Sequence, residues 1–348
     1  TAHAQRAVQL ERFTPSLDAE GFLGVQGTRT PGSDHMTLGL FTDYATTLLQ
    51  VDRSTGGPVD VVKRRWGSVL SGELGLGPSA ALGVAVPLVL YQQGERLSAS
   101  DRHLAAFALG DPTLHVRYRF VGSAADTPDQ RRDGPGLALQ LSTDLPGGDT
   151  DAYAGEGATR AEARLLGDMH LLGAGIGGSV GLRHRFEGRR LYGVRLRDEL
   201  TFGAALRILI PPLYPLSGLV EVRGATDFRS RATTVVEGEA GLLYVLGPQL
   251  TLALAVGTGF TQGIGTPAFR AIAGLWYAPG NFDADHDGVP DSRDQCPFLA
   301  EDRDGYKDDD GCPDPDNDND LVPDADDLCP NEAALEDRDK DEDGCTDK

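Results

Sequence analysis

The sequence predicts an all-β protein, in which an antiparallel transmembrane β-barrel of about twelve strands precedes an acidic tail. Three observations support this fold class. First, the chain has 45 glycines and 21 prolines among 348 residues, which disfavours long helices because both residue types interrupt helix interiors. Second, many segments alternate large apolar side chains with small or polar ones, which is the period of a strand. Third, short and long connections alternate along most of the chain, as they do in outer-membrane barrels.

The alternation is clearest between Leu250 and Phe260, where the even positions are mostly large and apolar and the odd positions are small. Similar runs predict twelve strands, and an even number returns both ends of a barrel to one rim. Tight turns at 77–79, 173–175 and 247–249 alternate with longer loops at 93–106 and 146–158, whereas 122–134 and 187–190 break this rule. The predicted strands are 37–51, 60–76, 80–92, 107–121, 135–145, 159–171, 175–186, 191–207, 213–225, 233–246, 249–260 and 268–278.

Two other folds are weaker explanations. The uncharged stretches 74–94 and 240–269 are long enough for transmembrane helices, but each interior glycine would cost about 1 kcal/mol and each proline about 3 kcal/mol. A soluble barrel would point its apolar face inward, and a dozen strands could not fill that interior with Leu and Val. We therefore expect the apolar face to contact lipid, with aromatic residues such as Trp66 and Trp276 near the rims. The opposite face should be a lumen cross-linked by ion pairs among Arg117, Arg119, Asp144, Glu162, Arg164, Asp168, Arg183, Arg185, Arg195, Arg197, Glu199, Glu221, Arg223, Glu237, Glu239 and Arg270.

Charge and cysteine content divide the chain near Gly280. Residues 281–348 carry 26 acids against 6 bases, residues 1–280 carry 27 against 26, and all four cysteines lie in the tail. We therefore expect an N-terminal periplasmic segment at 1–34, a barrel at 35–280 and a separate tail at 281–348. The absence of a basic stripe in the sequence argues against a nucleic-acid partner, and paired cysteines favour an oxidising compartment.

The tail has the spacing of a calcium-binding loop. The run from Asp283 to Asp294 places carboxylates at positions 1, 3, 5, 9 and 12, with glycine at 6 and a backbone carbonyl at 7. Such loops supply the six to eight oxygens that Ca²⁺ binds at about 2.3–2.6 Å. A second loop repeats the pattern with Leu321 at position 6, where a side chain should strain the turn. We expect several calcium ions, with ligands from Asp283, Asp285, Asp287, Val289, Asp291, Asp294, Asp302, Asp304, Asp308, Asp310, Asp316, Asp318, Asp320, Val322, Asp324, Asp327, Asp337, Asp339, Asp341 and Asp343.

The cysteines follow the same repeat. Cys296 and Cys312 are 16 residues apart, Cys329 and Cys345 are 16 apart, and the two units start 33 residues apart. Four cysteines allow three pairings, and the repeat favours one disulfide within each unit. A zinc site is the competing interpretation, but the tail lacks a CxxC motif and a nearby histidine, and carboxylates prefer calcium. Without metal, we expect the acidic tail to be disordered.

The segments DADHDGVPDSRDQCP and DPDNDNDLVPDADDLCP resemble thrombospondin type 3 repeats. A barrel followed by such repeats is similar to the outer-membrane-protein-A-like proteins of Gram-negative bacteria, and the opening run Leu10 to Ser16 is similar to the segment before the barrel in that group. The resemblance implies a calcium-wrapped rod without regular secondary structure, and in that family a C-terminal peptidoglycan-binding domain follows. This sequence stops at Lys348 within a repeat, so we expect peptidoglycan contact only through a domain outside it.

These observations predict a structural protein of the bacterial outer membrane whose repeats form a rigid periplasmic spacer towards a cell-wall-binding domain. The alternative is a channel or porin that passes small solutes, with the repeats as a linker. The lipid bilayer is the expected partner in both cases. Enzyme activity is not expected, because the sequence has no GxSxG, HExxH or P-loop motif and its seven histidines are scattered.

Overall fold

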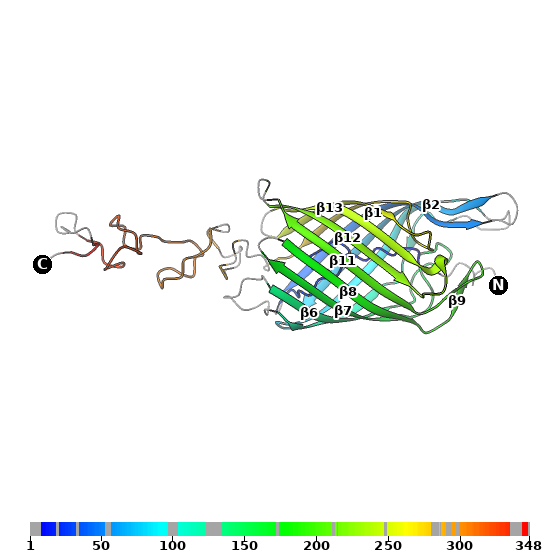
Figure 1. The fold of residues 1–348 in the computed structure, drawn as a ribbon, viewed down its shortest axis with the longest axis horizontal. Helices are drawn as coiled ribbons and strands as arrows, with labels where there is room; N and C mark the ends of the chain where they lie inside the picture. Colours follow the sequence, from blue (N-terminus) through cyan, green and yellow to red (C-terminus); the bar gives the residue numbers. More distant parts are fainter. Residues whose placement is uncertain are drawn as a thin grey trace. The chain divides into compact units, whose positions relative to one another are not determined.

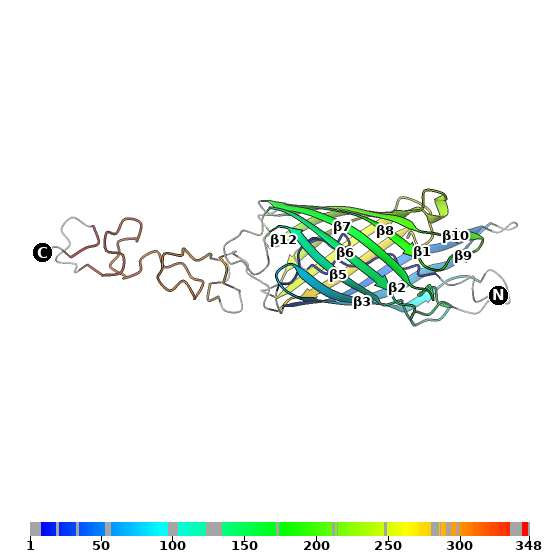
Figure 2. The same ribbon diagram turned by 90° about the horizontal axis from the view of Figure 1, so that it is seen from below.

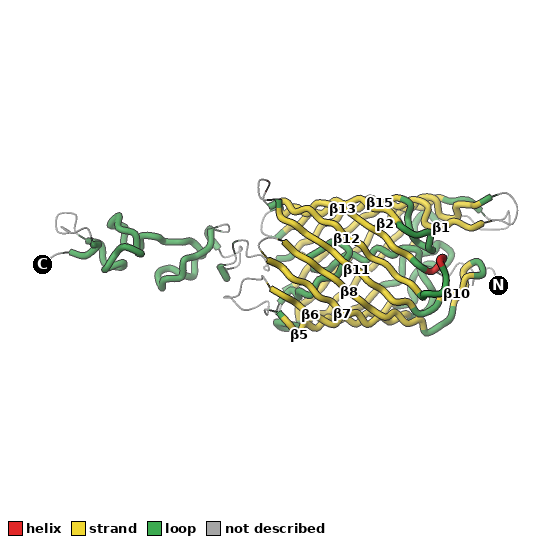
Figure 3. The backbone as a smooth tube through the Cα atoms, viewed as in Figure 1, coloured by secondary structure: helices red, strands yellow, loops and turns green. Residues whose placement is uncertain are grey.

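A computed structural model of the chain describes residues 8–18, 21–32, 35–52, 57–96, 104–122, 134–171, 174–210, 213, 215–246, 249–279, 285, 287–289, 294–296, 299–334 and 343–346. The chain divides into two compact units, Thr1–Asn281 and Phe282–Lys348. The first unit contains the β-sheet and the second has irregular structure over its described residues (Figures 1 and 3). Each unit is described by itself.

Twelve strands of the first unit close into one antiparallel barrel, as predicted (Figures 1 and 2). Strand β15 pairs back with β1, with Leu38 opposite Tyr277, and so completes the ring. Helical structure among the described residues is confined to 3-10 conformation, at Leu213 and in the turn η3 (Arg231–Thr233). No described helix has the length and apolar character to span a membrane. The barrel strands are β1 (Met36–Asp52), β2 (Pro58–Gly75), β3 (Ala80–Gln93), β5 (Thr113–Val121), β6 (Gly134–Asp144), β7 (Arg160–Leu171), β8 (Ala174–Arg185), β11 (Glu199–Leu209), β12 (Leu216–Thr226), β13 (Val235–Val245), β14 (Leu250–Gly259) and β15 (Phe269–Tyr277).

The two faces of the barrel follow the predicted alternation. On β14, Leu254 is 64% exposed whereas Ala255 is 7% exposed, so the large apolar residue points outward and the small one points into the lumen. The same outward apolar face continues around the wall at Leu40, Leu70, Val84, Val116, Leu139, Ile176, Leu182, Val220 and Val256. A continuous apolar outer surface is the surface that a bilayer requires.

Two predicted strands are interrupted. Predicted strand 107–121 is divided into β4 (Ala108–Leu109) and β5, and only β5 belongs to the ring. Predicted strand 191–207 is in fact a hairpin of β9 (Arg189–Leu191) and β10 (Val194–Leu196), followed by β11. The hairpin turns at Tyr192 and Gly193, whose φ angles of 46° and 86° suit a two-residue type I′ turn.

The side-chain directions required three further corrections. Arg195 in β10 and Arg197 just after it are exposed, so these two do not line the lumen, whereas Arg119 is half-buried near the end of β5. Trp276 lies near a rim as expected, one residue before the end of β15, but it is 1% exposed because its position in the alternation points into the barrel rather than towards lipid.

The two ends of the barrel differ in their connections. We call the end with segments 94–112, 145–159, 186–198, 227–234 and 260–268 the loop rim. The opposite end, with connections 76–79, 172–173, 210–215 and 246–249, is the turn rim. The long segment 122–133 also connects strands at the turn rim, and only its first residue is described.

The segment before β1 does not lie outside the barrel. Its described residues, 8–18 and 21–32, run through the lumen, and we call them the lumenal segment. At the loop rim, Leu10 N donates to Tyr153 O (3.1 Å), whereas near the turn rim Thr30 Oγ1 donates to Pro78 O (3.5 Å). The expected periplasmic segment at 1–34 is therefore corrected to a lumenal one over these residues. The physical reason is that a twelve-stranded barrel is too wide for its own side chains to fill.

The second unit is held by two disulfides, Cys296–Cys312 and Cys329–Cys345, which is the pairing that the repeat favours. Within it, the two cysteine-containing repeats share one pattern of backbone hydrogen bonds. Gln295 N donates to Asp310 O (2.8 Å), and 33 residues later Leu328 N donates to Asp343 O (2.9 Å). The sequence repeat is therefore also a structural repeat over these residues.

Candidate functional site

Three charged side chains of the barrel wall form hydrogen bonds with the backbone of the lumenal segment. The first is Glu221 of β12. Its carboxylate accepts hydrogen bonds from the backbone N–H groups of Leu23 (2.7 Å), Gly24 (2.7 Å) and Val25 (3.2 Å). Glu221 is 1% exposed. A buried carboxylate needs several donors, and here the donors come from the segment.

Asp168 of β7 and Arg117 of β5 hold the segment nearer the turn rim. The Asp168 carboxylate accepts from Thr28 N (2.7 Å) and from Thr28 Oγ1 (2.8 Å). Arg117 Nη1 donates to Gly27 O (2.9 Å) and to Arg29 O (2.8 Å). Asp168 therefore accepts from a backbone N–H of the segment, and Arg117 donates to two of its backbone carbonyls. Buried backbone groups require such partners.

Wall glycines make room for the side chains of the segment. A Cβ atom added at Gly177 would collide with the ring of Phe22, and one added at Gly136 would collide with Thr28. On the segment itself, a Cβ at Gly24 would collide with Arg223. The wall and the segment are therefore complementary in shape as well as in charge.

An apolar cluster also joins the segment to the wall. Phe13, Phe22, Leu23 and Val25 are all at most 2% exposed. They pack with wall residues that include Phe41 of β1 and Trp276 of β15, and Trp276 Nε1 donates to Ser16 O (2.9 Å). The described part of the segment is therefore packed against the wall as well as hydrogen-bonded to it.

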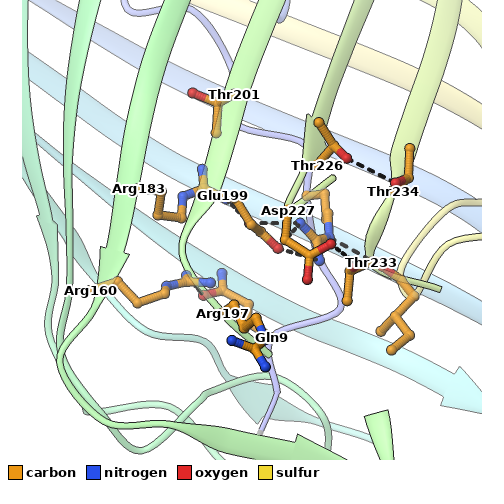
Figure 4. Close-up of polar contacts among 12 residues, drawn as sticks. Gln9, Arg160, Arg183, Arg197, Glu199, Thr201, Thr226, Asp227, Thr233 and Thr234 are labelled. Carbon is orange, nitrogen blue, oxygen red and sulfur yellow. Dashed lines mark hydrogen bonds and ion pairs between the residues drawn. The ribbon is translucent and has the colours of Figure 1, made fainter. Parts of the chain in front are cut away.

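Ion pairs link the segment to the wall near the loop rim, where Figure 4 shows Glu199, Arg183 and Arg160 of the wall and Gln9 of the segment. Glu199 of β11 lies 3.3 Å from Arg12 of the segment and also pairs with Arg183 (3.4 Å) and Arg185 (3.3 Å). Arg160 of β7 pairs with Asp144 (2.6 Å) and Glu156 (2.9 Å), and it donates to Gln9 Oε1 (2.7 Å).

The predicted ion pairs between β12, β13 and β15 are present. Arg223 bridges Glu237 (3.1 Å) and Glu239 (2.6 Å). Arg270 pairs with Glu237 (3.4 Å), with Asp43 of β1 (2.6 Å) and with Glu11 of the lumenal segment (2.8 Å). The sequence patterns identified most of these wall residues but not their partners in the segment, because the segment has no strand alternation.

Two small cavities of about 50 Å³ and about 80 Å³ lie beside the segment. Both are lined by Arg12, Thr14, Arg164 and Arg183. Neither is large enough for a solute path while the segment is in place.

In the second unit, the structure brings together two groups of the predicted calcium ligands. Carboxylate oxygens of Asp285, Asp287 and Asp294 lie within 4.8 Å of one another, and so do those of Asp316, Asp318 and Asp320. Val289 and Val322 take equivalent places, since their N–H groups donate to Asp287 (2.7 Å) and Asp320 (2.9 Å).

The other predicted ligands divide into three sets. Asp302, Asp304, Asp308 and Asp310 form no third such group among the described residues, and each accepts a backbone N–H instead. Asp343 accepts the N–H of Cys345, and Asp324 and Asp327 accept those of Asn317 and Cys329. The remaining predicted ligands, Asp283, Asp291, Asp337, Asp339 and Asp341, lie outside the described residues.

Several carboxylate oxygens of the second unit are buried and have no hydrogen-bond partner among the described residues: Asp318 Oδ2, Asp324 Oδ2, Asp327 Oδ2 and Glu301 Oε2. Partial desolvation raises the pKa of Asp318, and the charges of Asp320, Asp327 and Asp316 raise it further. The sequence did not identify Glu301 or Asn317 as candidate ligands. The side-chain Oδ1 of Asn317 is also buried without a hydrogen-bond partner among the described residues.

No family model matches the chain, and no curated protein matches it. Among solved structures, it is similar to an outer membrane channel from Pseudomonas putida F1, with 11% identity, a TM-score of 0.53, and coverage of 71% of this chain and 96% of that one. It is also similar to the NanC porin (10% identity, TM-score 0.45) and the KdgM porin (9% identity, TM-score 0.42), each with coverage of 69% of this chain and 98% of the other. The first of these likenesses shows that the chain shares the fold of an outer-membrane channel.

Proposed function

We propose that the chain is an outer-membrane channel that its own lumenal segment holds closed. The observation that carries this proposal is the grip of Glu221, Asp168 and Arg117 on the backbone of that segment. Glu221 and Asp168 direct their charges at the backbone of the segment, and Arg117 does so while also pairing with Glu73 of β2 (3.1 Å). If the segment left, the same residues would line a hydrated and charged path, which is the kind of lining that controls selectivity in channels.

The likeness to an outer membrane channel, which extends over 96% of that protein's chain, supports this proposal over a purely structural barrel. The spacer role predicted from the sequence becomes a secondary function of the tail. We place the loop rim outside the cell and the turn rim in the periplasm, since outer-membrane barrels have short periplasmic turns and longer outer loops. The even number of strands then directs the chain after β15 into the periplasm.

The test is single-channel conductance in planar bilayers. We expect the full chain to conduct rarely and a variant lacking residues 8–32 to conduct steadily. A locked variant provides the control. Thr28 Cβ lies 3.2 Å from the position that a Cβ at Gly136 would occupy, slightly below the separation of about 3.5–4.5 Å in disulfides. Asp168 Oδ1 lies 2.5 Å from the same position, so Thr28→Cys with Gly136→Cys should fix the segment to the wall once the Asp168 carboxylate shifts aside.

The locked variant should stay closed when oxidised. A reducing agent should return it to the behaviour of the full chain treated in the same way, which also controls for reduction of the two tail disulfides. A deletion variant that inserts as a folded barrel and yet never conducts would argue for the structural role instead.

We also propose that the tail binds calcium. The two carboxylate groups, Asp285 with Asp287 and Asp294, and Asp316 with Asp318 and Asp320, fit this cation because hard oxygen ligands cluster there. The buried oxygens of Asp318, Asp324 and Asp327 that lack a hydrogen bond among the described residues support the same assignment. Bound calcium would neutralise the repulsion and stiffen the repeats as a spacer.

A further inference from the structure

The hairpin β9–β10 at the loop rim has one apolar face and one basic face. Leu191 and Leu196 are 1% and 2% exposed and pack in an apolar cluster with Leu48, Val62 and Tyr153. The hydroxyl of Tyr192, at the turn, hydrogen-bonds with that of Tyr153. The hairpin is therefore held rigidly against the rest of the rim.

The basic face of the hairpin places two arginines opposite each other. Arg195 pairs across the hairpin with Arg190, and both are exposed, as is Arg197. Like charges directly opposite each other destabilise a strand pair. Among the described residues, none of these three guanidinium groups has an ion pair.

The neighbouring loop adds two more arginines. Strand β10 lies against η3, and Arg229 and Arg231 at that turn are both exposed. The acids nearby are already engaged: Glu187 pairs with Arg189 (2.9 Å), Asp198 pairs with His184 (3.1 Å), and Asp227 accepts from the N–H groups of Arg229 (2.9 Å) and Ser230 (3.2 Å). We call Arg190, Arg195, Arg197, Arg229 and Arg231 the arginine patch.

Exposed phenylalanines border the arginine patch. Phe186, which precedes the hairpin, is 63% exposed, and Phe228, next to Arg229, is 77% exposed. Phe228 has a φ of 59°, a conformation that is uncommon for a bulky residue and that fixes its direction. Exposed aromatic rings beside exposed arginines fit an amphiphile with an apolar body and an anionic headgroup.

We propose that the arginine patch binds the phosphate groups of lipopolysaccharide in the outer leaflet. Arginine recognises phosphate through paired N–H donors, and the cluster collects such donors at one rim of a barrel whose residues 1–280 are close to neutral. The phenylalanines would contact the acyl chains of the same lipid. This proposal does not depend on whether the barrel conducts.

The test measures binding of bisphosphorylated lipid A to the full-length protein in detergent. We expect Arg190→Gln with Arg195→Gln to weaken binding about tenfold, and substitution of all five patch arginines by Gln to weaken it further. The substitutions remove a repulsion, so the variants should fold. The matched control is Arg189→Gln, which changes an arginine on the other face of the hairpin, and it should bind as the unchanged protein does.

Three results would overturn the proposal. The first is unchanged lipid A binding by the variant that lacks all five arginines. The second is equal binding of dephosphorylated lipid A. The third is equally tight binding of soluble polyphosphate with the same dependence on the patch, which would assign the site to a soluble polyanion.

Discussion

The lumen and the tail both concentrate charge, but they balance it in different ways. In the lumen, acids and arginines from different strands pair with each other and with the lumenal segment, as Arg270 does with Asp43 and Glu11. In the tail, acids outnumber bases by 26 to 6. The charges of the lumen are therefore paired largely within the chain, whereas we propose that cations from solution balance those of the tail.

Calcium removal is expected to produce the largest difference between the two regions, because it should change the tail and leave the barrel as it is. A chelator should make residues 282–348 expanded and protease-sensitive, because the carboxylates of the tail then repel one another. The strand signal of the barrel should not change. Limited proteolysis and circular dichroism with and without chelator measure both regions in one sample. A tail that is equally compact in both conditions would contradict the calcium proposal.

A charge on the lipid-facing surface should be costly because nothing there can pair with it. Leu254→Arg is expected to lower the free energy of unfolding by about 2 to 4 kcal/mol, measured by urea titration in lipid vesicles. Ala255→Arg places the same charge in the lumen, where Ala255 packs in the apolar cluster. Ala255 is 7% exposed and shares that cluster with Phe13 and Phe22 of the segment, so the cost there should come from a clash and should fall when residues 8–32 are deleted.

The grip on the lumenal segment can be tested at Glu221. Glu221→Ala leaves three backbone N–H groups without their acceptor, which should weaken local protection by about 2 to 3 kcal/mol. Hydrogen exchange of the amides of Leu23, Gly24 and Val25 should accelerate by roughly 30- to 150-fold. Glu239→Ala is the matched control, because Glu239 lies opposite Glu221 and pairs with Arg223. Equal acceleration in both variants would show that Glu221 has no special role.

The smallest expected effect concerns the turn of the second acidic loop. Leu321 has a φ of 79°, close to the 93° of Gly288 at the same loop position. Because a side chain in this conformation costs about 1 to 2 kcal/mol, part of which the entropy of glycine offsets, Leu321→Gly should stabilise the second loop by about 1 kcal/mol. Calcium titration should show tighter binding there. The reverse change, Gly288→Leu, should weaken the first loop.

Local sequence patterns were sufficient to predict the wall of the barrel and the repeats of the tail. Strand alternation depends only on neighbouring residues, so Leu254 and Ala255 could be assigned to opposite faces from the sequence. The spacing of 16 between cysteines is also local, and it correctly favoured Cys296 with Cys312. The interruption at Tyr192 and Gly193 was missed because the apolar alternation continues through the turn.

The place of residues 8–32 was decided only by the tertiary structure. The partners of this segment are distant in sequence: Glu221 is about 200 residues from Leu23, and Asp168 is 140 residues from Thr28. Lone acids and arginines on a strand face predict a polar lumen but not what fills it. A barrel of twelve strands leaves a space that local propensities do not describe, and the buried charges of the wall select the segment whose backbone groups satisfy them.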